Sequence, residues 1–320
     1  MHVVLAQPRG FCAGVERAIA IVEKALDVYG APLYVRHEIV HNRWVVDSLR
    51  KKGAVFVDEL DVVPDGATVI FSAHGVSKAV ELEGQRRPLR VLDATCPLVE
   101  KVHRQAIRLH QDGYRVILIG HPGHPEVEGT VGQLPPGNME VIRDELSVTT
   151  LPDRPIQKVA YITQTTLSLD ETAHVVHRLR DRFPNIRSPG REDICYATQN
   201  RQNAVKSLAK RCDLILVLGA PNSSNSNRLR EVAEREGTSA FLIESADDVR
   251  MEWLQGVQTL GITAGASAPE LLVEGLLEHL GVDPENVEVL SVSEENLVFP
   301  LPRELLNPAD LIHSPDPHPP

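Results

Sequence analysis

Three segments of the chain carry apolar residues at the spacing of an amphipathic helix, at residues 12–30, 96–114 and 195–213. Positions three, six, ten and thirteen after the first residue of each segment form one helix face. Ten of these twelve positions are apolar, and the two exceptions are Thr198 and Arg201. A stripe of this kind predicts three helices, each packed against a sheet.

A short apolar run follows each predicted helix, at residues 32–35, 116–120 and 214–219. Continuous apolar runs of this length are typical of strands buried on both faces of a parallel sheet. Each run leads into a polar loop. Two further landmarks then recur in the same order: an apolar segment with acidic residues at 55–60, 141–146 and 241–249, and a strand–turn–helix junction at 69–80, 160–171 and 260–271.

The pattern therefore predicts one α/β unit of about 85–100 residues that occurs three times. We expect three pseudo-threefold-related α/β domains with mainly parallel sheets, whose loops at the carboxyl ends of the strands point to one centre. The expected limits are residues 1–95, 96–194 and 195–299, the last including a C-terminal return segment. Residues 300–320 are rich in proline and are expected to form a disordered tail.

Composition narrows the classes of function. A length of 320 residues alone suggests about two domains, and the repeat changes that number to three. The net charge of −11 disfavours a general nucleic-acid binder, whose affinity depends on basic residues. No apolar run reaches the length of a membrane helix, and Met1–Cys12 shows no signal-peptide pattern, so we expect a cytoplasmic protein.

Three of the four cysteines, Cys12, Cys96 and Cys195, stand at equivalent places directly before the predicted helices. A helix N-terminus carries partial positive charge, which favours thiolates. Three thiolates at a threefold centre suit an iron–sulfur cluster in which one iron has no protein ligand, although zinc held by three thiolates and water is an alternative. Cys212 lies at the far end of the third helix, on the apolar stripe, and is expected in the core.

The polar loops supply a second set of candidates. Histidine, serine and asparagine side chains at strand ends predict a phosphate-binding cradle without a Walker motif. Glu126 lies in a polar loop, and together with a hydroxyl of Thr165 it forms a plausible proton relay. In an extended loop Glu128 would face the other way. The candidate phosphate ligands are His41, His74, His124, Ser223, Ser224, Asn225 and Ser267.

Nine blocks in order, from residue 8 to about residue 270, resemble the 4-hydroxy-3-methylbut-2-enyl diphosphate reductases, the last enzymes of the non-mevalonate isoprenoid pathway. The blocks include PRGFCAGVERAI, SAHGVS, DATCPLVEKVH, GHPGHPEVEGT, TQTTLS, NSSNSNRL and TAGASAPE. The resemblance implies an iron–sulfur oxidoreductase with a trefoil of three α/β domains around one 4Fe–4S cluster.

By motif, the resemblance implies that Cys12, Cys96 and Cys195 hold the cluster. The seven phosphate candidates and Thr165 would bind the substrate, whose hydroxyl would reach the free iron. Glu126 and Thr165 would be catalytic, and loss of the hydroxyl as water would give isopentenyl and dimethylallyl diphosphate. A ferredoxin or flavodoxin would supply electrons, and neither nucleic acid nor membrane is an expected partner.

Two other functions stay open at the level of sequence. Quinolinate synthase is also similar as a three-domain, three-cysteine cluster enzyme, but its substrates are not diphosphates. A cluster-based redox sensor that binds DNA is a rival of another class, and the acidic charge and the lack of a helix-turn-helix pattern argue against it.

Overall fold

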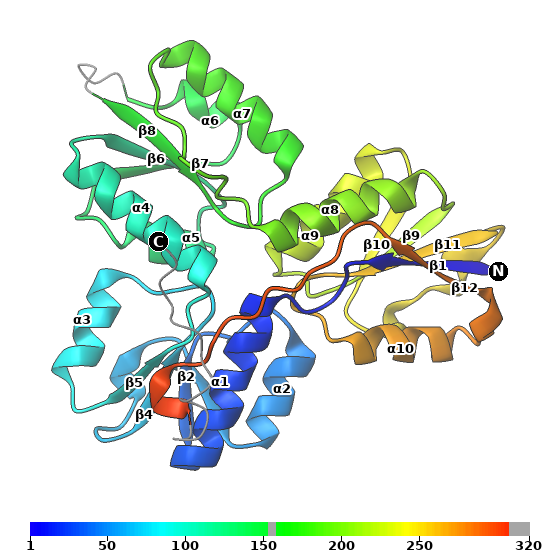
Figure 1. The fold of residues 1–320 in the computed structure, drawn as a ribbon, viewed down its shortest axis with the longest axis horizontal. Coiled ribbons are helices and arrows are strands. Elements are labelled where there is room, and N and C mark those ends of the chain that lie inside the picture. The colour runs from blue at the N-terminus through cyan, green and yellow to red at the C-terminus, as the bar shows by residue number, and fades with distance from the viewer. Residues whose placement is uncertain (153–157, 307–320) are drawn as a thin grey trace.

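The computed structural model describes residues 1–152 and 158–306, which fold into three α/β units around a common centre (Figure 1). Each unit contains a parallel sheet flanked by helices. The strands are β1 (His2–Gln7), β2 (Leu33–Arg36), β3 (Ala54–Val57), β4 (Thr68–Phe71), β5 (Arg90–Asp93), β6 (Arg115–Ile119), β7 (Met139–Ile142), β8 (Val159–Thr163), β9 (Leu214–Leu218), β10 (Ser239–Ile243), β11 (Thr259–Ala264) and β12 (Val287–Ser291).

The three sheets share the order of three strands, which is β3-β2-β4 in the first sheet, β7-β6-β8 in the second and β10-β9-β11 in the third. The first sheet continues with β5, and the third continues with β1 and β12. Every pairing within them is parallel, so all carboxyl ends of a sheet lie at the same edge. The predicted fold of three parallel α/β units is confirmed.

The helices cover the sheets and fill the cores with apolar side chains. Those that follow the three cysteines are α1 (Ala13–Tyr29), α4 (Pro97–Gln111) and α8 (Tyr196–Ala209), and their apolar stripes are buried as predicted. The others are α2 (Arg43–Lys51), α3 (Lys78–Arg86), α5 (Pro125–Val131), α6 (Glu145–Thr149), α7 (Leu169–Arg182), α9 (Ser224–Arg235) and α10 (Glu270–His279). Short 3-10 turns span Leu60–Val62, Ala246–Asp248, Met251–Leu254, Pro284–Asn286 and Arg303–Leu305.

Each cysteine lies where the chain crosses from one unit to the next. Strand β1 pairs with β11 and β12 in the third sheet, and after Cys12 the helix α1 packs in the core of the first unit. Strand β5 belongs to the first sheet, and α4 after Cys96 packs in the second unit. Residue Arg187 bridges to the second sheet, and α8 after Cys195 packs in the third unit. All three cysteines therefore face the junction between units.

This arrangement differs from the expected limits of the first unit at one point. The repeat places residues 1–95 in that unit as a block, but β1 lies in the third sheet. The repeat rests on the helices that follow the cysteines, and their pattern does not determine where the preceding strand pairs.

The C-terminal return segment runs from β12 back to the first unit, alongside α1 (Figure 1). Leu305 is 1% exposed in the core of that unit, packed in a cluster with Leu33 and Ala18. The composition predicts a disordered tail from Pro300 onwards, but Leu301 and Leu305 at its start pack against the core of the first unit. Residues 307–320 lie outside the described part. Within residues 1–152 and 158–306, no helix combines the length and apolarity that crossing a bilayer requires.

Candidate active site

Loops from all three units meet in a central cavity of about 110 Å³. The structure places every site residue predicted from the sequence on its wall. They are Cys12, His41, His74, Cys96, His124, Glu126, Thr165, Cys195, Ser223, Ser224, Asn225 and Ser267. Among the described residues that line the cavity, none is lysine or arginine. Any anion bound there must therefore be held by neutral donors and imidazoles.

The three cysteines are anchored by equivalent backbone hydrogen bonds. Each cysteine N–H donates to a carbonyl in the strand–turn–helix junction of another unit, which fixes the start of its helix. The bonds run from Cys12 to Ala266 (3.2 Å), from Cys96 to Ala73 (3.0 Å) and from Cys195 to Thr165 (3.0 Å). The pseudo-threefold symmetry inferred from the sequence thus extends to the backbone around the thiols.

The thiols form a donor set that suits a metal cluster. Burial raises the pKa of Cys96 to about 12 and that of Cys195 to about 11, and the neighbouring thiols add to both shifts. Three such thiols become thiolates together only if a cation neutralises them. At Gly14 a Cβ would stand 2.6 Å from the Cys96 Sγ and 3.9 Å from the Cys12 Sγ, so the missing side chain leaves room between two sulfurs.

The geometry does not favour a single ion. In the described part of the chain, no three His, Cys, Asp or Glu side chains converge as one metal ion requires. The zinc alternative therefore gains no support from the described residues. Thiols are the donors that iron–sulfur clusters use, and three of them lie in the wall of this one cavity.

Three imidazole rings gather in the wall of the cavity. The rings of His41 and His74 stack with their centroids 4.1 Å apart, and His124 lies edge-on at 5.3 and 5.8 Å. Burial, with the neighbouring rings, lowers the pKa of His124 to about 3 and that of His74 well below its usual range. Both rings are neutral at pH 7 without a ligand, and an anion would favour their protonated forms.

Several polar atoms in this wall have no partner within the protein. The Nε2 of His41 and the Nδ2 of Asn225 are buried and accept or donate no hydrogen bond among the described residues. Their other polar atoms are occupied: His41 Nδ1 contacts Glu38 at 3.1 Å, and Asn225 Oδ1 accepts from the Ala266 N–H at 2.8 Å. Buried polar groups normally find partners, so these two atoms mark where a polar ligand belongs.

Glu126 is the buried acid of the cavity. The Thr165 N–H donates to its Oε1 at 2.7 Å, and the Thr165 hydroxyl donates to its Oε2 at 3.0 Å. Burial raises the pKa of Glu126 to about 7, and these hydrogen bonds oppose the shift. A carboxyl that titrates near neutrality beside a hydroxyl is suited to proton transfer.

Two stretches predicted as loops are helical. Glu126 stands in the first turn of α5, which His124 caps by accepting the Glu126 N–H at its Nδ1. Glu128 is exposed on the same short helix, so its different orientation follows from helical rather than extended geometry. Ser223 caps α9, with Ser224 and Asn225 in the first turn. The sequence does not reveal where these two helices begin, because Pro125 and the polar residues at the strand ends are typical of loops. Both helix N-termini favour an anion nearby.

Sequence reasoning missed two polar residues next to the thiols. Thr198 donates its N–H to the Cys195 Sγ at 3.4 Å, and its hydroxyl lies 3.2 Å from the same sulfur. Arg201, one turn further along α8, is 0% exposed. Both were visible as the polar exceptions on the third apolar stripe. Cys212 is buried in the core of the third unit, as predicted.

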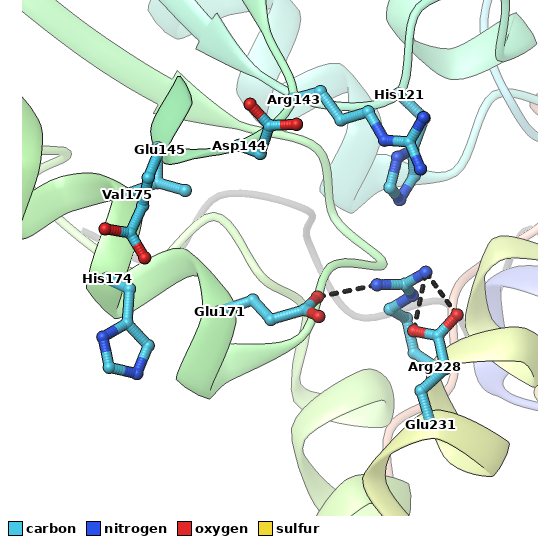
Figure 2. A pocket seen from close by; sticks show the side chains of 9 residues that line it. All are labelled: His121, Arg143, Asp144, Glu145, Glu171, His174, Val175, Arg228 and Glu231. Carbon is cyan, nitrogen blue, oxygen red and sulfur yellow. Dashed lines mark hydrogen bonds and ion pairs between the residues drawn. The ribbon is translucent and has the colours of Figure 1, made fainter. Parts of the chain in front are cut away.

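A second hollow of about 410 Å³ lies between the second and third units (Figure 2). Its wall is charged rather than apolar. Arg228 of α9 reaches across to Glu171 of α7 and also pairs with Glu231, each at 2.7 Å. Arg235 adds a second contact to Glu171 at 2.5 Å. The two ion pairs to Glu171 join the units, and Glu171 follows closely in sequence on the segment that carries Thr165.

Fold and site together define a class of protein: a three-unit α/β protein whose central cavity combines three thiols, three imidazoles and a buried carboxyl. The chain belongs to the LytB protein family, whose model matches residues 3–281.

Among curated proteins, the chain is 68% identical to the 4-hydroxy-3-methylbut-2-enyl diphosphate reductase of Magnetococcus marinus, over 95% of this chain and 99% of that protein. It is 57% identical to the protein of the same name from Pseudomonas aeruginosa, over 95% and 98%. The matched relatives carry the reductase name, and the quinolinate synthase and sensor alternatives are not favoured.

Solved structures agree. The E-1-hydroxy-2-methyl-but-2-enyl-4-diphosphate reductase from Plasmodium falciparum matches with a TM-score of 0.92 at 36% identity, covering 97% of this chain and 98% of that one. A structure described as (E)-4-hydroxy-3-methyl-but-2-enyl diphosphate reductase, the terminal enzyme of the non-mevalonate pathway, matches with a TM-score of 0.62 at 31% identity, covering 88% and 99%.

Proposed function

We propose that this chain reduces 4-hydroxy-3-methylbut-2-enyl diphosphate to isopentenyl diphosphate and dimethylallyl diphosphate. Its membership of the family and its likeness to named reductases over nearly the whole chain support this function. The observation that carries the proposal is the cavity itself, whose wall combines imidazoles and other neutral hydrogen-bond donors, a buried acid and three thiols.

We propose that Cys12, Cys96 and Cys195 hold one 4Fe–4S cluster. Equivalent anchoring of the three thiols and the space at Gly14 support this assignment. When bound, the cluster supplies electrons to the substrate and an iron without a protein ligand. The three thiols would hold that group in the cavity whose wall the carboxyl of Glu126 also lines.

The diphosphate belongs, on this proposal, among His41, His74, His124, Ser223, Ser224, Asn225 and Ser267. The two unpartnered atoms, His41 Nε2 and Asn225 Nδ2, gain an acceptor when the anion binds. His124 accepts the Glu126 N–H at Nδ1, so its proton stands on Nε2 and is free to donate. The start of α9 adds the partial positive charge of a helix N-terminus.

Glu126 supplies protons. The overall change is the addition of two electrons and two protons to the substrate, with loss of its hydroxyl as water and retention of the diphosphate. Near pH 7 a substantial fraction of Glu126 is protonated, and Thr165 shares a hydrogen bond with it. The carboxyl gives one proton to the departing hydroxyl oxygen, so the product oxygen leaves as neutral water rather than as hydroxide.

Three further elements of the proposal come from the sequence. Electrons arrive from a ferredoxin or a flavodoxin, and the reaction takes place in the cytoplasm. The three units, with limits near residues 95 and 194 and with β1 in the third sheet, supply one cysteine each at their crossovers. The return segment closes the arrangement by joining the third unit to the first.

Iron and sulfide analysis of anaerobically purified protein, with an absorption spectrum and a turnover assay with reduced carrier, tests the proposal. Wild-type protein is expected to hold four irons per chain and to form both products. Cys12→Ser, Cys96→Ser and Cys195→Ser should each deplete iron, whereas the matched control Cys212→Ser should not. Full iron content in the three variants, or a loaded wild-type protein without turnover, would overturn it.

A further inference from the structure

Arg201 is a fully buried cation near the thiols that the proposed chemistry does not use. Its side chain is 0% exposed, on the stripe of α8 where only Thr198 and Arg201 are polar. All three guanidinium nitrogens donate hydrogen bonds within the protein. The acceptors are the carbonyls of Gly10, Phe11 and Ala197 and the carboxylate of Glu295, at distances from 2.8 to 3.2 Å.

These bonds connect two of the cysteines. Gly10 and Phe11 form the loop directly before Cys12, and their carbonyls accept from Nε and Nη2 of Arg201. Arg201 itself stands on α8, whose N-terminal cap is Cys195. The planar guanidinium thus fixes the Cys12 loop at a set distance from the Cys195 helix. Lysine, with a single ammonium, cannot reproduce this fork.

The partner of Arg201 comes from the far end of the chain. Glu295 lies on the return segment after β12 and accepts from Nη1 of Arg201 at 3.0 and 3.1 Å, and from Nδ2 of Asn200 at 3.0 Å. Only 13% of its side chain is exposed. Further along, Arg17 holds the Pro300 carbonyl at 2.8 Å. Figure 1 shows this segment crossing from the third unit to the first.

The pair also places two opposite charges close to Cys12. Arg201 donates to the carbonyl of Phe11, the residue directly before Cys12, and Glu295 accepts from the same guanidinium. The two side chains are 0% and 13% exposed, and solvent screens such buried charges only weakly.

Building on the proposed cluster, we propose that Arg201 and Glu295 are positioning residues: they fix Cys12 relative to Cys195, and their charges set the reduction potential of the group that the cysteines hold. A reduced cluster carries one more negative charge than an oxidised one. Removing the anion Glu295 should favour the reduced form and raise the potential, whereas removing the cation Arg201 should lower it. A merely structural role predicts no such opposition of sign.

The test is a redox titration of reconstituted holoenzyme, in which dithionite supplies the electron and the spectrum of the cluster is followed. Glu295→Gln should shift the midpoint potential to a more positive value. Glu294→Gln is the matched control, because it removes the same charge from the neighbouring, exposed residue, and its potential should equal that of wild type. Arg201→Lys keeps the charge but loses the fork, so it should lower iron content with the potential unchanged.

The outcomes distinguish a failure of the role of Arg201 and Glu295 from a failure of the proposed reductase function. A wild-type protein that binds no cluster refutes the proposed function. A loaded Glu295→Gln protein whose potential matches the control, or moves to a more negative value, overturns the role of the pair. If Arg201→Lys holds full iron after the same reconstitution, the positioning role is wrong.

Discussion

Replacement of Glu126 by glutamine removes one ionisable group and leaves the shape of the site almost unchanged. The amide oxygen can still accept the Thr165 N–H that now donates to Oε1 at 2.7 Å. The amide N–H₂ can donate to the Thr165 hydroxyl oxygen, which now lies 3.0 Å from Oε2. Substrate affinity and iron content should therefore change little, whereas the variant lacks the carboxyl proton that Glu126 donates.

The magnitude follows from the pKa of Glu126 and from its role. General acids contribute about 10²–10⁴-fold to a rate, so kcat should fall by that factor. The pKa rises from 4.5 to about 7 in the fold, which corresponds to about 3 kcal/mol of cost for the ionised form. Between the two values the folded protein binds more protons than the unfolded chain, so wild-type stability falls as pH rises through this window. Glu126→Gln should lack that fall.

Anaerobic turnover with a reduced carrier, measured from pH 6 to pH 9, is the assay. Wild-type kcat should fall above a pH of about 7, as Glu126 loses its proton, and the variant should show no such limb. Glu128→Gln, which changes an exposed acid on the same helix, is the control and should behave as wild type. Turnover of Glu126→Gln within a factor of about ten of wild type would refute the role of general acid.

Three other changes give further expected outcomes. Gly14→Ala places a Cβ 2.6 Å from the Cys96 Sγ and should lower bound iron; unchanged iron would contradict the fit. Thr165→Val removes a hydrogen bond that lowers the pKa of Glu126, so kcat should drop and the alkaline limb should move to higher pH, with iron content preserved. Glu171→Gln breaks two partly exposed ion pairs between units and should cost less than about 1 kcal/mol, less still at high salt; an equal loss of melting temperature at both salt concentrations would count against it.

Most of the fold could be predicted from the sequence, because the pattern of buried apolar positions occurs three times along the chain. Three helical stripes and three apolar runs predicted the units, and the parallel strand orders confirm them. Periodicity says which residues are buried but not which strand is the neighbour. The place of β1 in the third sheet therefore came only from the structure.

The candidate site could also be predicted only in part from the sequence. The motifs around the cysteines and histidines led to residues that line one cavity. The sequence did not identify Arg201 as a functional residue, because a polar residue on an apolar stripe usually marks only an interruption of the buried helix face. Its role depends on the carbonyls of Gly10 and Phe11 and on Glu295, which are distant in sequence and meet it only in the fold. No local sequence pattern predicts contacts between residues so far apart in the chain.

The pairing of β1 has a consequence for biosynthesis. Its two neighbours, β11 and β12, lie near the other end of the described residues, so they are synthesised long after β1. The apolar residues Val3, Val4 and Leu5 therefore have no neighbouring strand until β11 has been made. Cys12 follows β1 directly, so on the function proposed above the cluster would assemble only after the strands of the third sheet have been synthesised.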